Sequence, residues 1–535
     1  MRHVKSTICV AALLGIAILC PAANAKQPKQ ITLTPIGRYS AGPGIERAEI
    51  AAYDRATRRI FSINPTLSRV DVLDISDPSD PVLEFTISLG GRPNSVALHR
   101  GVVAVAVENA IKTDPGFVKF FDTSGILLST VTVGALPDML IFTPNGRRLL
   151  VANEGEPNDA YTVDPEGSVS IIDMTVGAAN LTQADVRTAT FSDSIPKTNP
   201  LSIRKYGPGA TLAQDLEPEF IAVSHNSKTA WVTLQENNAI AILDIEAGVF
   251  SQLVGLGFKD HSQAGNGLDG SDADGGINIA NWPVFGIYQP DAIDSYRVRG
   301  VTYLVMVNEG DTRAFAGLNE EVRVGSSSYI LDAATFPNAA VLKQNANLGR
   351  LTVTNATGDT DGDGDFDQIV VPGGRSFSIR TAQGELVFDS GDQFEQITAA
   401  QVAASFNSNG TAATFDTRSD NKGPEPEGVI LGKAFGHTYA FIGLERTAGV
   451  LVYDVSDPFS PTFIQYVNTS PDDISPEGLL FIKADDSPTG KPLLVVSHEI
   501  SSTTTIFEIT KGSGPFSVAG GTADNGSSKG KMRTR

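Results

Sequence analysis

The stretch LPDMLIFTPNGRRLLVANEG, residues 136–155, contains two short apolar runs separated by a polar turn. Asp138 stands at the start of the first run and Glu154 follows the second. This pattern predicts two antiparallel strands joined by a turn. The start of one strand and the end of the next lie at the same end of an antiparallel pair, so we expect Asp138 and Glu154 to be neighbours.

Six related stretches occur along the chain, and they begin at Arg47, Arg92, Glu217, Gln289, Glu425 and Ser475. A third strand that ends in an acid usually follows, as in SVSIIDM and GVLVYDV, and several repeats also show a fourth strand. Four short strands repeated seven times predict an all-β fold, a seven-bladed β-propeller. The last repeat ends near Ile509 with little room for an outer strand. We therefore expect ITLTPIGRYS, from Ile31, to complete the seventh blade.

The two ends of the chain differ from the repeats. Residues 1–25 contain Arg2 and Lys5, the apolar run ICVAALLGIAILC and then ANA, which is the layout of a cleavable secretory signal. The protein is therefore predicted to be secreted or periplasmic, with the propeller in residues 26–510. Residues 511–535 are rich in Gly and Ser and predict a disordered tail, with no membrane span and no C-terminal anchor that we recognise.

The amino-acid composition excludes several kinds of site and of binding partner. Both cysteines lie within the predicted signal, so the mature chain would have no disulfide, thiolate metal site or cysteine nucleophile. The formal net charge of −20 makes nucleic acid and anionic membranes poor partners and divalent cations good ones. With six histidines in the whole chain, a histidine-rich zinc site is hard to assemble.

The repeats place acids in two series that should meet at one end of the propeller channel; we call these residues the acidic ring. One series begins the first strand of each repeat: Glu49, Asn94, Asp138, Glu219, Asp291, Glu427 and Glu477. The other ends the second strand: Glu108, Glu154, Glu236, Glu309, Glu445 and Glu499, with Pro65 in the remaining repeat.

Carboxylates about 4 to 6 Å apart repel one another, so the acidic ring should either raise their pKa values or attract cations. A hard, oxygen-preferring ion, above all Ca²⁺, is the occupant that this ligand set favours. Another divalent metal would use the same ligands. The alternative is a water-filled polar channel with partly protonated acids.

Long insertions are expected on the same face, at about 157–167, 191–215, 255–288, 312–374 and 390–424; the fourth lies within blade five. The segment DTDGDGDFD alternates Asp359, Asp361 and Asp363 and adds Asp367, as in calcium loops of the EF-hand type. The position of the usual bidentate Glu is Val370. An ordinary acidic turn is the alternative.

A second segment, LDGSDADGGIN, is interpreted equally well as a turn or as a calcium site. Its oxygen-bearing residues are Asp269, Asp272, Asp274 and Asn278.

Basic residues within the acidic motifs could hold a phosphate or sulfate bridged to a metal. Arg313 follows NEGD, Arg418 and Lys422 precede the second EPE motif, and Arg446 follows Glu445. The alternative for each is a salt bridge that neutralises the acidic ring. His498, in SHEI, is either a ligand or proton carrier, or a hydrogen-bonded structural histidine.

The segments VANEGEPN, WPVFGIYQPDAI, DTDGDGDFD, FDSGDQFEQ, TRSDNKGPEPEG and GLERTAGVLVYDVSDP strongly resemble the choice-of-anchor I family. That family groups secreted bacterial propeller proteins with the mesenchyme-specific cell-surface glycoproteins of biomineralising animals. The resemblance runs from about Ile31 to Ile509 and implies a secreted or surface-held propeller with an acidic, calcium-associated face. Some members are labelled alkaline phosphatase.

Two functional hypotheses follow. The first is a secreted calcium-binding propeller that acts as a metal-dependent phosphoesterase, with Glu154, Glu309 and Glu427 among the metal ligands. Its catalytic phosphate contacts would be Arg418, Lys422 and Arg313. The second hypothesis is a calcium- or mineral-binding surface protein without catalytic activity.

Overall fold

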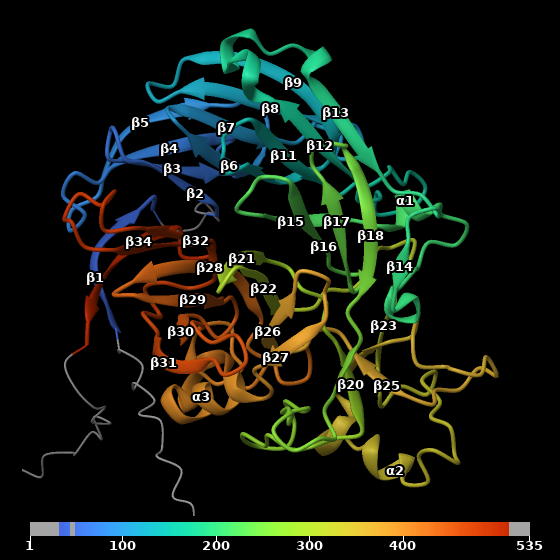
Figure 1. The fold of residues 1–535 in the computed structure, drawn as a ribbon. Helices are drawn as coiled ribbons and strands as arrows, with labels where there is room; N and C mark the ends of the chain where they lie inside the picture. The colour runs from blue at the N-terminus through green and yellow to red at the C-terminus, as the bar shows by residue number, and fades with distance from the viewer. Residues whose placement is uncertain (1–30, 43–48, 513–535) are drawn as a thin grey trace, which may run out of the picture.

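The computed structural model describes residues 31–42 and 49–512. The predicted signal peptide, and all of the predicted tail except Lys511 and Gly512, lie outside these residues. The fold is a β-propeller, in which sheets are arranged around a central axis (Figure 1). The prediction of an all-β propeller is confirmed.

The first three four-stranded sheets, which we call blades one to three, follow one another along the chain. Blade one contains β2 (Ala51–Asp54), β3 (Arg59–Asn64), β4 (Arg69–Asp74) and β5 (Val82–Ser88). Blade two contains β6 (Pro93–His99), β7 (Val102–Val107), β8 (Pro115–Asp122) and β9 (Leu127–Ala135). Blade three contains β10 (Pro137–Phe142), β11 (Arg148–Asn153), β12 (Ser168–Asp173) and β13 (Val186–Thr190).

The next three sheets are interrupted by insertions. Blade four contains β15 (Pro218–Val223), β16 (Thr229–Leu234), β17 (Ala239–Asp244) and β18 (Val249–Gly255), and β14 (Lys197–Thr198) pairs in parallel with β18. Blade five contains β21 (Ile293–Val298), β22 (Val301–Asn308), β26 (Ser376–Thr381) and β27 (Leu386–Asp389). Blade six contains β28 (Pro426–Ala434), β29 (His437–Leu444), β30 (Val450–Asp454) and β31 (Thr462–Val467).

The two ends of the described chain meet in blade seven. This sheet contains β32 (Pro476–Ile482), β33 (Leu493–His498), β34 (Thr503–Lys511) and, as its outer strand, β1 (Ile31–Ser40). The pairing of β1 with β34 runs from Ile31 opposite Lys511 to Ser40 opposite Thr503. The N-terminal strand therefore completes this sheet, as the sequence predicted. The first strands of neighbouring sheets contact one another all the way round, with β32 returning to β2.

Burial follows the position of each strand in its blade. The second strands, such as β7 and β11, lie between neighbouring sheets on both faces and are almost continuously apolar and buried. The outer strand β5 alternates between exposed and less exposed residues, because only one of its faces packs on the core. The apolar core is thus divided into clusters between adjacent sheets, such as the cluster of blades one and two around Phe61 and Val105.

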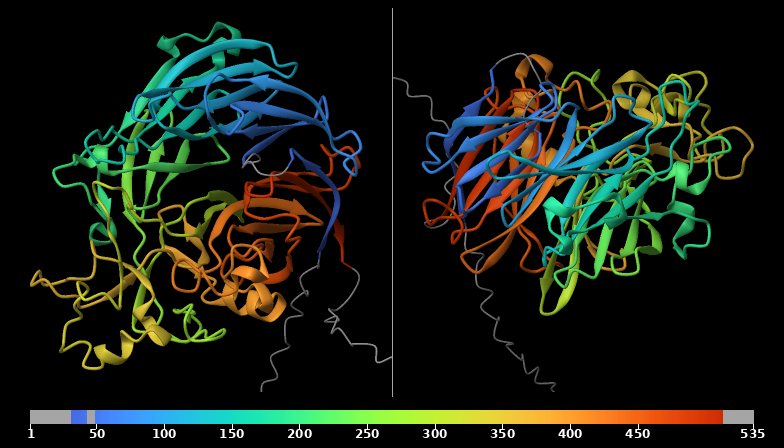
Figure 2. Two further views of the ribbon diagram at one scale, coloured as in Figure 1. Left: turned by 180° about the vertical axis from the view of Figure 1, so that it is seen from behind. Right: turned by 90° about the horizontal axis from the view of Figure 1, so that it is seen from above.

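Two insertions pack together at the side of the propeller (Figure 2). The segment between blades four and five contains β19 (Phe258–Asp260) and β20 (Val284–Ile287). The insertion predicted at about 312–374 lies between β22 and β26 and contains β23 (Glu321–Arg323), α2 (Ala339–Leu342), β24 (Thr352–Thr354) and β25 (Ile369–Val371). Because β20 pairs in parallel with β25, the two segments form one unit, whose own core includes Tyr329 and Phe366.

The remaining helices are short and lie in the connections. They are α1 (Leu212–Asp215), α3 (Gln393–Gln401), the 3-10 turns η1 (Met174–Val176), η2 (Ala178–Asn180), η3 (Gln183–Asp185), η4 (Pro200–Ser202), η6 (Ala403–Ser405) and η7 (Ala412–Thr414), and the π turn η5 (Asn345–Gly349). Within the described ranges, no helix is long and apolar enough to cross a membrane.

The closure of blade seven gives a first prediction. Leu33 of β1 is 4% exposed, whereas its neighbour Thr32 is exposed. Leu33→Ala should lower the free energy of unfolding by about 2 to 4 kcal/mol, because a cavity remains between β1 and blade six. Thr32→Ala, the matched control on the same strand, should change it by about 0.5 kcal/mol or less. Urea denaturation measures both, and equal effects would contradict the closure by β1.

Candidate metal centre at the channel mouth

The acidic ring lies at one end of a cavity of about 760 Å³ that extends along the innermost strands. The members that line it are Glu49, Asn94, Asp138, Glu219, Asp291, Glu309, Glu427, Glu445, Glu477 and Glu499. They converge because each stands at the same end of the two innermost strands of its blade. Arg92 lies 3.5 Å from Glu49 and from Glu108, so this part of the ring has a basic neighbour.

Glu236 does not occupy the ring position that the sequence assigned to it. Pro137 is opposite Asn153 in blade three, and Pro218 is opposite Leu234 in blade four. The counterpart of Glu154 is therefore Gln235, which lines the cavity and donates a hydrogen bond to Glu309 over 2.8 Å. Glu236 comes one residue later, and a shift of one residue moves a side chain to the other side of an extended backbone.

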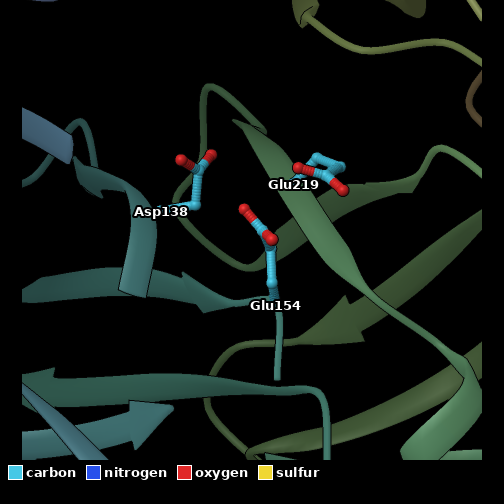
Figure 3. A group of neighbouring side chains, drawn as sticks. All are labelled: Asp138, Glu154 and Glu219. Atoms are coloured by element: carbon cyan, nitrogen blue, oxygen red, sulfur yellow. The ribbon is translucent and has the colours of Figure 1, made fainter. Parts of the chain in front are cut away.

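Asp138, Glu154 and Glu219 form the first carboxylate group, and Figure 3 shows their side chains converging from β10, the end of β11 and β15. One oxygen from each lies within 4.8 Å of the others. Burial and neighbouring carboxylates raise the pKa of Asp138 to about 7 and raise the pKa values of Glu154 and Glu219 well above their ordinary value. No basic side chain of the described residues pairs with any of the three.

A second group, Asp291, Glu309 and Glu427, comes from blades five and six, next in the ring to blades three and four. Here a cation is already present, since Lys422 Nζ lies 2.6 Å from Glu309 Oε1. Burial raises the pKa of Glu309 although Lys422 opposes this shift. Burial and the neighbouring Glu309 raise the pKa of Glu427 well above its ordinary range. Repulsion between carboxylates therefore remains in this group although Lys422 is present.

Glu309 also belongs to a third group with Glu425 and Glu445. Glu425 is fully buried and accepts hydrogen bonds from Arg418 Nε over 2.8 Å and from Arg446 Nε over 3.2 Å. Burial alone would raise the pKa of Glu425, but Lys422, Arg418 and Arg446 hold it below the ordinary value. This group is neutralised by side chains of the protein itself.

The basic residues considered as phosphate contacts are all paired. Arg418 and Lys422 bind the carboxylates described above, as their salt-bridge alternative requires. Arg313 is 1% exposed; it lies 3.0 Å from Glu217 Oε2 and donates a 2.7 Å hydrogen bond to the Tyr161 hydroxyl. Arg313 therefore lies in the buried layer between the ring and the insertions.

Sequence reasoning missed Glu217 and Glu425 as anchors of these cations. Both are the first Glu of an EPE motif, whose second Glu, Glu219 or Glu427, points into the channel. One motif thus supplies an arginine-binding carboxylate and a channel carboxylate. The duplication of EPE in blades four and six was the signal that could have revealed this.

The loop 359–367 belongs to the insertion of blade five, between β24 and β25. The structure brings carboxylate oxygens of Asp359, Asp361 and Asp367 within 4.8 Å of one another, but Asp363 is not in that group. Backbone amides already donate to these acids, for example Gly362 N to Asp359 over 2.7 Å and Thr360 N to Asp367 over 2.8 Å.

The two remaining candidates have structural partners. Asp272 accepts two 2.8 Å hydrogen bonds from Arg350, and Asp269 accepts the backbone amide of Asn278, which favours the turn over the calcium site. His498 is 1% exposed, and burial lowers its pKa to about 4, so it is neutral at physiological pH.

Sequence similarity assigns the chain to a protein family. The model of the choice-of-anchor I domain matches residues 49–458. The chain belongs to this family. Gigasin-3a of Magallana gigas is 27% identical over 190 residues, which cover 31% of this chain and 66% of that protein. The mesenchyme-specific cell surface glycoprotein of Strongylocentrotus purpuratus is 26% identical over 279 residues, which cover 46% of this chain and 36% of that protein.

Among solved structures, hydrazine synthase of Kuenenia stuttgartiensis has 12% identity and a TM-score of 0.47, with 88% of this chain and 97% of that chain covered. The WD40 domain of Toxoplasma gondii coronin has 9% identity and a TM-score of 0.43, with coverages of 91% and 87%. These likenesses concern the fold alone.

The raised pKa of Asp138 gives a second prediction. A carboxyl whose pKa is about 7 when folded and about 4 when unfolded stabilises the fold below about pH 4, and this contribution is lost as the pH rises to about 7. In chelator, Asp138→Asn should therefore become more stable relative to the parent protein between pH 5 and pH 8. Urea denaturation across this pH range tests the prediction.

The exposed residue Glu385 supplies the control variant Glu385→Gln, which should show no such trend. A constant difference between Asp138→Asn and the parent would contradict the burial of a repelled charge.

Proposed function

We propose that this choice-of-anchor I protein is an exported calcium-binding propeller whose principal ion site is formed by Asp138, Glu154 and Glu219. The observation that carries this proposal is the convergence of three carboxylates with no basic partner among the described residues. Ca²⁺ binds carboxylate oxygens at about 2.3 to 2.6 Å. Two ligands on opposite sides of one ion are then about 5 Å apart, so oxygens within 4.8 Å of one another can share an ion.

The electrostatics of the group also favour a cation. The raised pKa values mean that these acids resist ionisation in the protein's own field. A divalent ion would supply the opposite charge that Lys422, Arg418 and Arg446 supply around the acids of blades five and six. The channel mouth provides a route for entry, since Asp138 and Glu219 line the open cavity.

Two further groups could take ions by the same chemistry. Asp291, Glu309 and Glu427 share their space with Lys422, so an ion there would have to compete with an ammonium group. Asp359, Asp361 and Asp367 form an exposed site on the insertion. We expect the Asp138 group to bind most tightly, because its charge is the least compensated.

Calcium titration tests the principal site. Adding Ca²⁺ to chelated protein should raise its melting temperature; at 100 times Kd the gain is about 2.7 kcal/mol, because the ion binds only the folded state. Asp138→Asn combined with Glu154→Gln should abolish the high-affinity phase, whereas Asp359→Asn should remove only a separate, weaker phase. The control Glu385→Gln should behave like the parent protein. A parent protein that shows no change over millimolar Ca²⁺ would refute the proposal.

A second candidate, metal-dependent phosphoester hydrolysis, is favoured by one observation. Lys422 and Arg446 line the same cavity as the carboxylate groups, so a phosphate there would meet both cations and ion-binding acids. A bound divalent ion would polarise a phosphoryl oxygen and lower the pKa of water. Lys422 would neutralise charge on the phosphate only by giving up its contact with Glu309. The alternative is a calcium- or mineral-binding protein without catalytic activity.

Hydrolysis assays separate these two functions. If the protein is a phosphoesterase, it should cleave a chromogenic phosphomonoester or phosphodiester at alkaline pH, and chelator should abolish the activity. Lys422→Ala should then cost roughly 10- to 1000-fold in kcat, the range of a single electrostatic contact. Calcium binding by a folded protein that cleaves neither ester with any divalent metal would instead support the non-catalytic function.

A further inference from the structure

On the face opposite the acidic ring, a set of basic residues lies at the inner turns, and acids lie at the outer turns. The inner turns are those that join the first and second strands of each blade, at the other end of strands about 20 Å long. Exposed basic residues occur at or beside these turns in blades one to six: Arg58, Arg100, Arg147, Lys228, Arg299 and Lys433. None of these six forms an ion pair with another described residue, whereas the nearby Arg59 and Arg148 pair with Glu84 and Asp173. We call the six residues the basic turns.

The backbone at these turns is not the one that arginine prefers. Arg100 and Gly101 have φ values of 48° and 80°, and Arg299 and Gly300 have values of 51° and 89°. Two central residues with positive φ form the tight hairpin turn in which Asn-Gly is the favoured sequence. A side chain as long as arginine is uncommon in this conformation. Its presence in two blades, with Arg58 at 57° in a third, suggests that the charge serves a purpose other than making the turn.

A cavity opens among the basic turns. It has a volume of about 650 Å³, and His225, Arg297 and Lys433 contribute to its lining. Asp294 lines both this cavity and the one bounded by the acidic ring, so the two cavities adjoin. The Asp294 carboxylate accepts the backbone amides of Ser295 and Leu431 over 2.6 and 3.0 Å, so hydrogen bonds to the backbone already hold it.

The positive region has an acidic border. In blade seven the corresponding turn carries Asp485 and Asp486, and Asp486 pairs with Arg55 and Lys483. The outer turns that join third and fourth strands carry Asp77 and Asp457, whose carboxylates accept backbone amides. Asp74 and Asp173 also interact electrostatically with Arg58 and Arg147. The basic charge thus lies at the inner turns of blades one to six, within an acidic outer border.

We propose that the basic turns bind an anionic polysaccharide, a sugar polymer that carries sulfate, phosphate or carboxylate groups. The protein has a net charge of −20, so long-range attraction to polyanions is not expected and local placement of cations must account for binding. Cations spread over six blades match a linear polymer better than a single small ion. Phe435, 39% exposed and two residues from Lys433, offers an aromatic face to a sugar ring.

A lipid surface fits this face less well. Peripheral membrane binding needs apolar side chains that enter the bilayer in addition to basic charge. Of the large apolar residues that are exposed, only Phe435 and Val301 lie on the described first-to-second-strand turns. Ile126, Val249 and Phe459 are exposed at the outer turns of the same face, but acids that an anionic lipid surface would repel lie beside them. The predicted export of the chain would also place it among cell-surface glycans.

Binding of dextran sulfate, with neutral dextran as the reference, tests the proposal at several salt concentrations and with Ca²⁺ held constant. The parent protein should bind dextran sulfate with an affinity that falls as salt rises, and it should not bind dextran. Lys228→Glu combined with Lys433→Glu should weaken binding by roughly 10-fold, because each reversal removes an attraction and adds a repulsion. Lys205→Glu is the matched control: Lys205 is exposed in the insertion before blade four, and this variant should bind like the parent.

A second variant removes the risk of misfolding. Arg100→Asn combined with Arg299→Asn places a favoured residue at both positive-φ positions, so the melting temperature should be kept or raised while affinity for dextran sulfate falls. Unchanged affinity in both basic-turn variants would overturn the proposal. So would equal losses in the Lys205→Glu control, or binding to anionic phospholipid vesicles or single-stranded DNA in place of dextran sulfate.

Discussion

Repulsion among carboxylates at the channel mouth is the constraint on which the rest of this structure depends. The propeller brings the ends of its innermost strands to one axis, and these ends carry acids in nearly every blade. Burial removes the water that would screen them, so the pKa values of Asp138, Glu427 and Glu477 are raised. Such a group can be neutralised by protons, by basic side chains or by metal ions.

Two of these solutions can be compared within one ring. Around Glu425 the protein supplies its own cations, and Arg418, Lys422 and Arg446 keep that carboxyl ionised. Around Asp138 it supplies none among the described residues. Two of these basic residues come from outside the blades, since Arg418 and Lys422 belong to the long connection between blades five and six. The insertions therefore help to set the charge of the mouth.

The periodic part of the structure could be predicted from the sequence. Repeated strands and the spacing between Asp138 and Glu154 were sufficient to predict the propeller, the outer strand β1 and most of the ring. Glu236 is wrong as a ring position because register, not residue type, decides which side chain faces the channel. The separation between Asp138 and Glu154, applied from Glu219, gives Gln235. The partners of Arg313 and Arg418 could not be predicted, because contacts between a long insertion and the ring have no period. The pairing of β20 with β25 joins two different connections and was missed for the same reason.

The central claim, that the uncompensated carboxylates hold a divalent cation, is tested most directly by anomalous diffraction from crystals grown with Ca²⁺ and from crystals soaked in a lanthanide. The account predicts one strong peak between Asp138, Glu154 and Glu219, with carboxylate oxygens about 2.3 to 2.6 Å from it in the calcium form. The Glu425 group should show no peak, because Arg418 and Arg446 occupy its oxygens. Absence of a peak at the Asp138 group, with its carboxyl groups hydrogen-bonded to one another at neutral pH, would contradict the account.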